Sequence, residues 1–117
     1  MRARGEAAAA LRDAKRRLDT LDWYPEPVRI DGVRMAVVPW FFRLPGLRRF
    51  SGYALHGAIL LRHPPTPDLV THELCHVWQM QHRPLRMPLS YLRFGYLRNP
   101  YEAEARRAVA ATRSPAP

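Results

Sequence analysis

One five-residue stretch of the chain carries the residue types that bind a metal ion and use it. It reads His72-Glu73-Leu74-Cys75-His76 and fits the pattern His-Glu-x-x-His. In a helix, two histidines four residues apart project from one side, so both imidazoles can reach one tetrahedral zinc ion. The glutamate after the first histidine can take a proton from the metal-bound water. The stretch therefore predicts a zinc site with His72 and His76 as ligands and Glu73 as the catalytic base.

The residues before and after this stretch predict the helix that must carry it. Thr66 suits the N-cap, Pro67 the first helical position, and Asp68 the positive end of the helix dipole. We expect this helix to run to about Gln81 and to stop before Pro84. At about 100° per residue, its apolar side chains gather on the side opposite the two histidines. Those side chains are Val70, Leu74 and Val77. A pair of core histidines would more often share the apolar side, so the arrangement indicates a site.

Zinc with a catalytic role needs a third protein ligand and leaves a fourth position for water. Asn99-Pro100 repeats the signal of a cap followed by proline and opens a last helix over about 100–112. Glu102 and Glu104 lie near its start on different faces, so only one can point at a given metal. Their alternative role is that of a solvated acidic pair at a helix N-terminus. The other candidates are weaker: His82 as a surface or capping group, His56 as a cleft residue, and Cys75 as a small buried side chain.

The rest of the chain predicts a few short elements. An alanine-rich helix is expected over residues 5–20, packed at the edge of the domain. Runs at 28–30 and 33–38 flank Asp31-Gly32, which predicts a hairpin. Residues 52–61 are expected to form another strand, 83–90 a loop interrupted by prolines, and 91–98 a short helix.

Composition indicates a single compact domain and a strongly positive net charge, which has two possible explanations. The chain has 117 residues, enough for one compact domain, and only one cysteine, so no intrachain disulfide can form. We see neither a signal peptide nor a transmembrane segment, so a cytoplasmic location is the expectation. The net charge is +9, and nearly all basic residues are arginines. Such charge can indicate nucleic acid or an anionic membrane, or reflect an arginine-rich composition. We favour composition and do not expect nucleic-acid binding.

At this point the sequence resembles a family. His72 to Gln79, followed about 25 residues later by Asn-Pro-Tyr-Glu-Ala-Glu-Ala, is similar to the small bacterial minimal gluzincin domains of the zincin metallopeptidases. The family pattern is H-E-x-x-H-x-x-Q followed by P-x-E-x-E-A, and the similarity runs from about residue 33 to about residue 110. The corresponding organisation is an N-terminal helix over 1–22, a minimal zincin-like domain over 23–113 and a disordered tail over 114–117.

The resemblance implies an α+β fold, in which a small twisted antiparallel or mixed sheet packs on the metal helix and a C-terminal glutamate helix. It implies Glu102 as the third ligand, with Glu104 supporting or solvated. It also implies that residues 52–61 form an edge strand, to which a peptide or protein substrate adds as a further strand. Many gluzincins carry an Asp, which accepts a hydrogen bond from a ligand histidine, where this chain has Arg106. Arginine cannot accept one. A tyrosine or histidine usually steadies the oxyanion in this class; Tyr91, Tyr96 and Tyr101 are available, and the spacing selects none of them.

Three hypotheses on function follow. In the first, the domain is a zinc-dependent peptidase in which metal-activated water attacks the peptide bond and Glu73 moves the proton. In the second, zinc chiefly stabilises a binding or scaffold domain with little or no turnover. In the third, which rests on charge alone, the domain is a basic module for nucleic acid or membrane surfaces.

Overall fold

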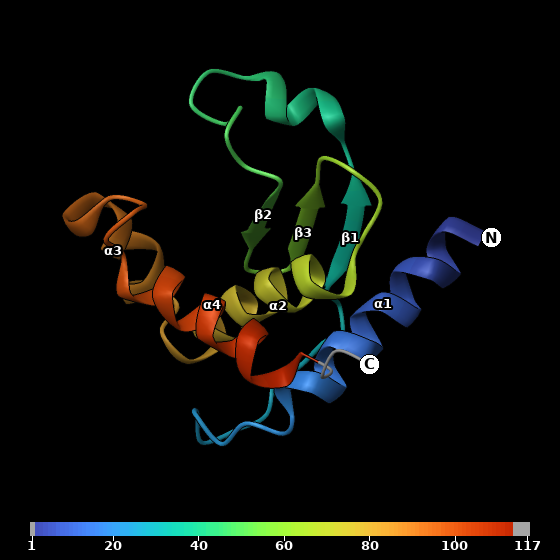
Figure 1. The fold of residues 1–117 in the computed structure, drawn as a ribbon, viewed down its shortest axis with the longest axis horizontal. Coiled ribbons are helices and arrows are strands. Elements are labelled where there is room, and N and C mark those ends of the chain that lie inside the picture. The colour runs from blue at the N-terminus through green and yellow to red at the C-terminus, as the bar shows by residue number, and fades with distance from the viewer. Residues whose placement is uncertain (1, 114–117) are drawn as a thin grey trace.

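A computed structural model describes residues 2–113, with four helices, a short 3-10 helix and a small mixed sheet of three strands. The expected α+β class is confirmed. Figure 1 shows helix α2 (Pro67–His82) at the centre of the molecule, between the sheet and helix α4 (Pro100–Thr112). Helix α1 (Arg2–Leu18) packs beside α2, and helix α3 (Arg86–Phe94) lies at the other end of the molecule. The expected tail at 114–117 lies outside the described residues.

Helix α2 begins at Pro67, as its capping sequence predicts. The Thr66 side chain accepts a hydrogen bond from the backbone N–H of Leu69 at 3.2 Å, and Pro67 occupies the first turn. Nearly every residue from Val70 to Met80 is buried, and His72 alone in that stretch keeps partial exposure. A helix buried on almost all sides can hold its side chains in fixed positions, which a metal site requires.

The sheet differs from the expected one in two places. Strand β1 (Arg34–Val37) pairs in parallel with β3 (Ala58–Leu61), and β2 (Gly52–Leu55) pairs with β3 antiparallel. The predicted hairpin about Asp31-Gly32 is therefore wrong. The turn forms, with Gly32 at φ 79°, but residues 28–30 are not a strand. Val28 instead lies buried in the core.

The single strand expected over residues 52–61 is two strands. A turn at His56 and Gly57 folds β2 back on β3, so the central position of the sheet belongs to β3 and β2 becomes an edge. The edge position expected for this segment therefore holds for Gly52–Leu55 and not for Ala58–Leu61.

The N-terminal helix contributes to the core, contrary to the expectation that it packs only at the edge. Its residues Leu11, Ala14 and Leu18 are buried against α2 because they fall on one face at helical spacing. Apart from Val28, the remainder of the core comes from α2, β3 and α4. Its members there include Ile59, Leu61, Val70, Leu74, Cys75, Val77, Trp78, Ala105 and Ala108.

Helix α3 lies five residues earlier at its start than the predicted helix over 91–98, and it occupies part of the predicted loop. Pro88 is its third residue, where a proline removes no hydrogen bond that the helix needs. Gly95 ends it at φ 69°. The last helix, α4, begins as predicted, with the Asn99 side chain accepting hydrogen bonds from the N–H groups of Tyr101 and Glu102.

Candidate metal centre

Two helices bring the three predicted ligands together. His72 and His76 lie one turn apart on α2, and Glu102 lies in the first turn of α4, which packs against α2. One carboxylate oxygen of Glu102 is 3.1 Å from Nε2 of His72, and the other is 2.9 Å from Nε2 of His76. The ligand atoms of all three residues lie within 4.8 Å of one another. This group could hold a metal ion.

The hydrogen bonds of Gln79 settle which nitrogen of His76 carries a proton. The Gln79 amide donates to the backbone oxygen of Tyr101 at 2.9 Å and to Oε1 of Glu104 at 3.0 Å. Both of those partners only accept, so its nitrogen faces them and its oxygen faces Nδ1 of His76 at 2.8 Å. Nδ1 of His76 must therefore donate. In the neutral ring, Nε2 then carries the free lone pair that a metal needs.

That lone pair faces another acceptor. Nε2 of His76 is fully buried and has no partner in hydrogen-bonding geometry, although Oε2 of Glu102 is 2.9 Å away. Two buried acceptors this close repel each other unless a cation lies with them. A proton can supply that charge. Burial opposes a charged His76, but the Glu102 carboxylate outweighs it and raises the pKa of the ring. Burial likewise opposes a charged Glu102, but the hydrogen bond from His72 and the charge of the neighbouring His76 lower the pKa of that carboxyl. The donor set fits a divalent cation.

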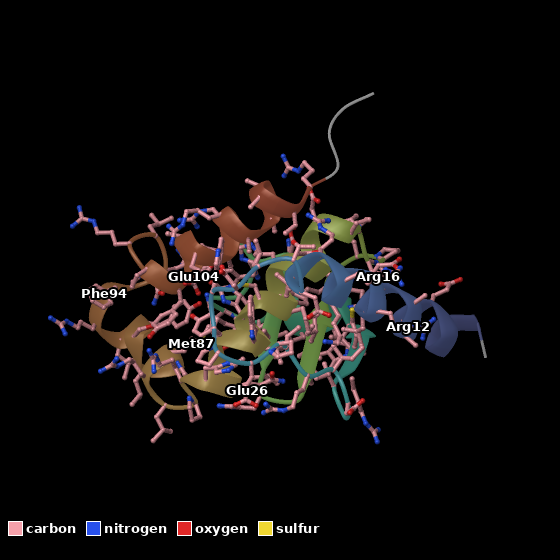
Figure 2. The ribbon with its side chains drawn as sticks, turned by 90° about the horizontal axis from the view of Figure 1, so that it is seen from below. Arg12, Arg16, Glu26, Met87, Phe94 and Glu104 are labelled. Atoms are coloured by element: carbon pink, nitrogen blue, oxygen red, sulfur yellow. The ribbon has the colours of Figure 1, made fainter. Side chains whose placement is uncertain are left out.

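Glu104 supports this centre and is not one of its ligands. Its Oε1 accepts from the Gln79 amide and from the hydroxyl of Tyr24 at 2.6 Å. A chain of hydrogen bonds thus runs from Tyr24 through Glu104 and Gln79 to His76. Of the two glutamates that the sequence left open, the structure brings Glu102 to the histidines and Glu104 to the residue behind them. Figure 2 labels Glu104 on α4.

Tyr91 is the one of three candidate tyrosines that contacts a ligand. Its hydroxyl donates to Oε2 of Glu102 at 2.6 Å. Tyr96 lines the same cleft, and burial together with the charges of Glu102 and Glu73 raises its pKa. Tyr101 contributes only its backbone oxygen, to Gln79.

Glu73 lies beside the three ligands, buried against the edge strand. A Cβ atom added to Gly52 of β2 would come within 2.8 Å of Oε2 and 2.9 Å of Cγ of Glu73. Only glycine at position 52 leaves room for this side chain in its present position. Burial raises the pKa of the Glu73 carboxyl, while His76 and His72 oppose that shift. A carboxyl in such surroundings binds a proton more readily than an exposed one, as a general base must.

A cleft of about 470 Å³ opens over these residues. One wall is β2, with Gly52, Tyr53, Ala54 and Leu55, and the opposite wall comes from α3 and the segment after it. The His72, Glu73, His76 and Glu102 side chains line it as well. His56 also reaches the cleft, as expected, and its Nε2 lies 3.0 Å from the backbone oxygen of Pro84.

Two other predicted residues lie away from the ligand group. Cys75 is buried in the core, as expected, and burial raises the pKa of its thiol. His82 is at the end of α2, where its ring stacks on Tyr24 at 5.0 Å and its Nδ1 lies 3.2 Å from the oxygen of Trp78. Arg106 lines a second hollow that also contains His72. Gln79 is the residue that supports a ligand histidine, His76, from behind. Among the described residues, Nδ1 of His72 has no hydrogen-bond acceptor.

Sequence reasoning gave no role to Gln79, Tyr24 or Gly52. Gln79 could have been found, because a residue three positions after His76 lies on the same face of the helix. Tyr24 reaches the centre from 80 residues away, and nothing local marks it. Gly52 stands out only once β2 is seen against α2.

Comparison with protein families, with curated proteins and with solved structures finds no match to this chain. Within residues 2–113, no helix has the length and apolar character that crossing a membrane requires.

Proposed function

We propose that this protein is a zinc-dependent peptidase. The observation that carries the proposal is the buried, unpartnered Nε2 of His76, which faces Glu102 beside His72 and Glu73 at the floor of an open cleft. A buried core gains nothing from this arrangement, because without a shared proton or metal ion the two acceptors repel each other. A hydrolytic metal site does need it, together with a nearby carboxylate and access for substrate.

The proposed metal is zinc, held by His72, His76 and Glu102. Two imidazoles and one carboxylate, with a further position facing a cleft, are the donors typical of catalytic zinc. When bound, zinc would supply the Lewis acidity that makes water acidic and a carbonyl electrophilic. Gln79 orients the His76 ring, and Tyr91 orients the Glu102 carboxylate, so the chain holds both ligands before the metal arrives.

Glu73 is the proposed general base. Its carboxylate takes a proton from the attacking water and later gives it to the leaving amine. Packing against Gly52 holds that carboxylate at the cleft wall. Tyr96, which lines the cleft, is the candidate donor to the oxygen of the scissile carbonyl as negative charge develops there.

The proposed substrate is an extended peptide beside β2. This strand pairs with β3 on one side only, so its other backbone edge faces the cleft. An extended peptide could add to that edge through main-chain hydrogen bonds, which select for conformation more than for sequence. Its carbonyl groups would then pass near Glu73.

The substitution Glu73→Gln tests the proposal, because it keeps shape and removes the base. Hydrolysis of a mixed peptide library should fall by about 10² to 10⁴-fold while zinc content stays that of the wild type. Exposed Glu26, changed to Gln, is the matched control and should keep full activity. Unchanged hydrolysis by the zinc-loaded Glu73→Gln protein would contradict the proposed role of Glu73 as general base.

A zinc-stabilised scaffold with little turnover is the alternative, and one observation favours it. His72 has no acceptor behind Nδ1 among the described residues, which weakens the support that catalytic ligands usually have. In that case the wild type would cleave no peptide in the library, yet a chelator would strongly lower its thermal stability.

A further inference from the structure

Helix α3 exposes a stripe of leucines. Leu85 is the residue before its first turn, and Leu89 and Leu92 follow at spacings of four and seven, so all three project from one side. Their exposed fractions are 72%, 57% and 85%. Leu97, just beyond the helix, is 79% exposed. Monomeric proteins rarely leave so many large apolar side chains together on the surface without a use for them.

The opposite side of α3 fixes this orientation. Met87 and Ser90 are buried, and Asn99 donates to the Ser90 hydroxyl at 2.8 Å. Figure 2 places Met87 and Phe94 at the end of the molecule away from Arg12 and Arg16. The leucine stripe is therefore held outward by packing on its far side, and a small rotation of α3 cannot bury it.

The segment that carries the stripe is rich in arginine and has no acidic residue. Residues 83–98 contain no Asp or Glu. Four exposed arginines lie in this segment: Arg83, Arg86, Arg93 and Arg98. Long basic side chains at the border of an apolar face can keep their charges at a headgroup layer while leucines enter the acyl boundary.

We propose that this surface, defined by Leu85, Leu89, Leu92, Leu97 and the four arginines, docks on an anionic lipid bilayer. Outward apolar side chains, in a segment whose charges are all positive, match a flat anionic apolar surface. A symmetric contact with a second copy would set arginine against arginine. Nucleic acid would use the arginines and leave the leucines in water.

Docking here would also orient the cleft. Met87, Pro88 and Tyr91 of α3 line the cleft from the face next to the stripe. A bilayer held against α3 would therefore lie close to the mouth of the cleft. This surface is independent of the proposed hydrolysis, since none of its leucines or arginines is a proposed ligand or base.

Co-sedimentation with vesicles tests the proposal on the full chain. We expect binding to vesicles of phosphatidylcholine and phosphatidylglycerol in equal parts, weaker binding at high salt, and little binding to phosphatidylcholine alone. The double variant Leu89→Ser, Leu92→Ser should bind at least about tenfold more weakly. Replacing Arg86 and Arg93 with Gln should cost about fivefold for each arginine.

Matched changes elsewhere keep the test specific. Arg12→Gln with Arg29→Gln removes the same charge from exposed positions outside α3, and should leave binding nearly unchanged. In a Leu92→Trp variant, brominated lipid should quench the fluorescence of the new tryptophan. This reports insertion into the bilayer, and the side chain at position 92 stays apolar. The proposal is overturned if the wild type ignores anionic vesicles, if the α3 variants bind as well as it does, or if the control pair loses as much. Leucine-dependent dimerisation without lipid binding would also overturn it.

Discussion

The side-chain oxygen of Gln79 accepts a hydrogen bond from Nδ1 of His76 at 2.8 Å, while the amide nitrogen of the same residue donates to Tyr101 and Glu104. One amide thereby fixes the tautomer of a buried histidine. The free lone pair of His76 must lie on Nε2, beside Glu102. The candidate metal centre depends on this relationship as much as on the residues that would touch the ion.

Removing the Gln79 amide should weaken the metal site. In Gln79→Leu, the His76 ring loses the acceptor that selects its tautomer, so zinc affinity should fall about 10 to 100-fold. Competition with a chromophoric chelator measures this affinity. Gln81→Leu is the control, because Gln81 also makes two hydrogen bonds, to the backbone of Arg29, on another side of the helix. Equal affinity in Gln79→Leu and the wild type would show that Gln79 does not position the ligand.

Filling the space over Glu73 should impair hydrolysis and spare the metal. The added Cβ of Gly52→Ala would meet Oε2 of Glu73 at 2.8 Å, so the carboxylate must move. A displacement of the base near 1 Å can cost about 10²-fold in rate. Zinc content should not change.

Gly57 provides the control for that substitution, because a Cβ there meets nothing within 4 Å. Gly57→Ala should therefore keep nearly full activity. If Gly52→Ala hydrolysed peptides as fast as Gly57→Ala, Glu73 would not need its present position.

The outer end of the hydrogen-bond chain should contribute mainly to stability. Tyr24→Phe removes the hydroxyl that donates to Glu104 at 2.6 Å, and the free energy of unfolding should fall by about 1 to 2 kcal/mol. Zinc affinity should change less than in Gln79→Leu, because Gln79 still holds His76. Urea unfolding of the metal-free protein measures the first effect. Tyr53→Phe, at an exposed position on β2, is the comparison. Equal loss in both variants would refute a special role for Tyr24.

Zinc affinity should fall as the pH falls. Burial opposes protonation of His76, but the Glu102 carboxylate outweighs it, so the pKa of the metal-free ring lies above its ordinary value of 6.5. Protons therefore compete for Nε2 already above that pH, and the competition grows at lower pH. Glu102 has a lowered pKa and stays a carboxylate through this window. Titrations with zinc across the range should show this slope, and an affinity independent of pH would contradict the assignment of His76.

Local signals predicted the parts of the fold that depend on neighbouring residues. Thr66 and Asn99 cap α2 and α4 where the sequence places the caps, because capping involves a side chain and the next few backbone N–H groups. The spacing of His72 and His76 placed both on one helix face for the same reason. Such local signals do not predict which strands pair when they are far apart in the sequence. Asp31-Gly32 forms its turn, yet β1 pairs with β3, which follows it by more than 20 residues.

In the candidate site, too, local sequence predicts some residues and only the tertiary structure identifies others. The histidines follow from a motif. The helix start left Glu102 and Glu104 open, and the family resemblance favoured Glu102. The packing of α4 on α2 supplies the physical reason, since it brings Glu102 to the histidines and Glu104 to Gln79. Tyr24 enters from the other end of the chain. The break of 52–61 at Gly57 was missed because the apolar run on both sides reads as one strand, and the turn residues are few.

Metal analysis of purified protein tests the central claim, that His72, His76 and Glu102 bind zinc, most directly. Wild type should carry one zinc ion per chain, and His76→Ala and Glu102→Ala should lose it while circular dichroism shows that each is folded. Glu26→Gln, at an exposed glutamate outside the centre, should keep the wild-type content. A wild type that neither contains zinc nor takes it up, or a Glu102→Ala variant with unchanged zinc content and affinity, would contradict the account.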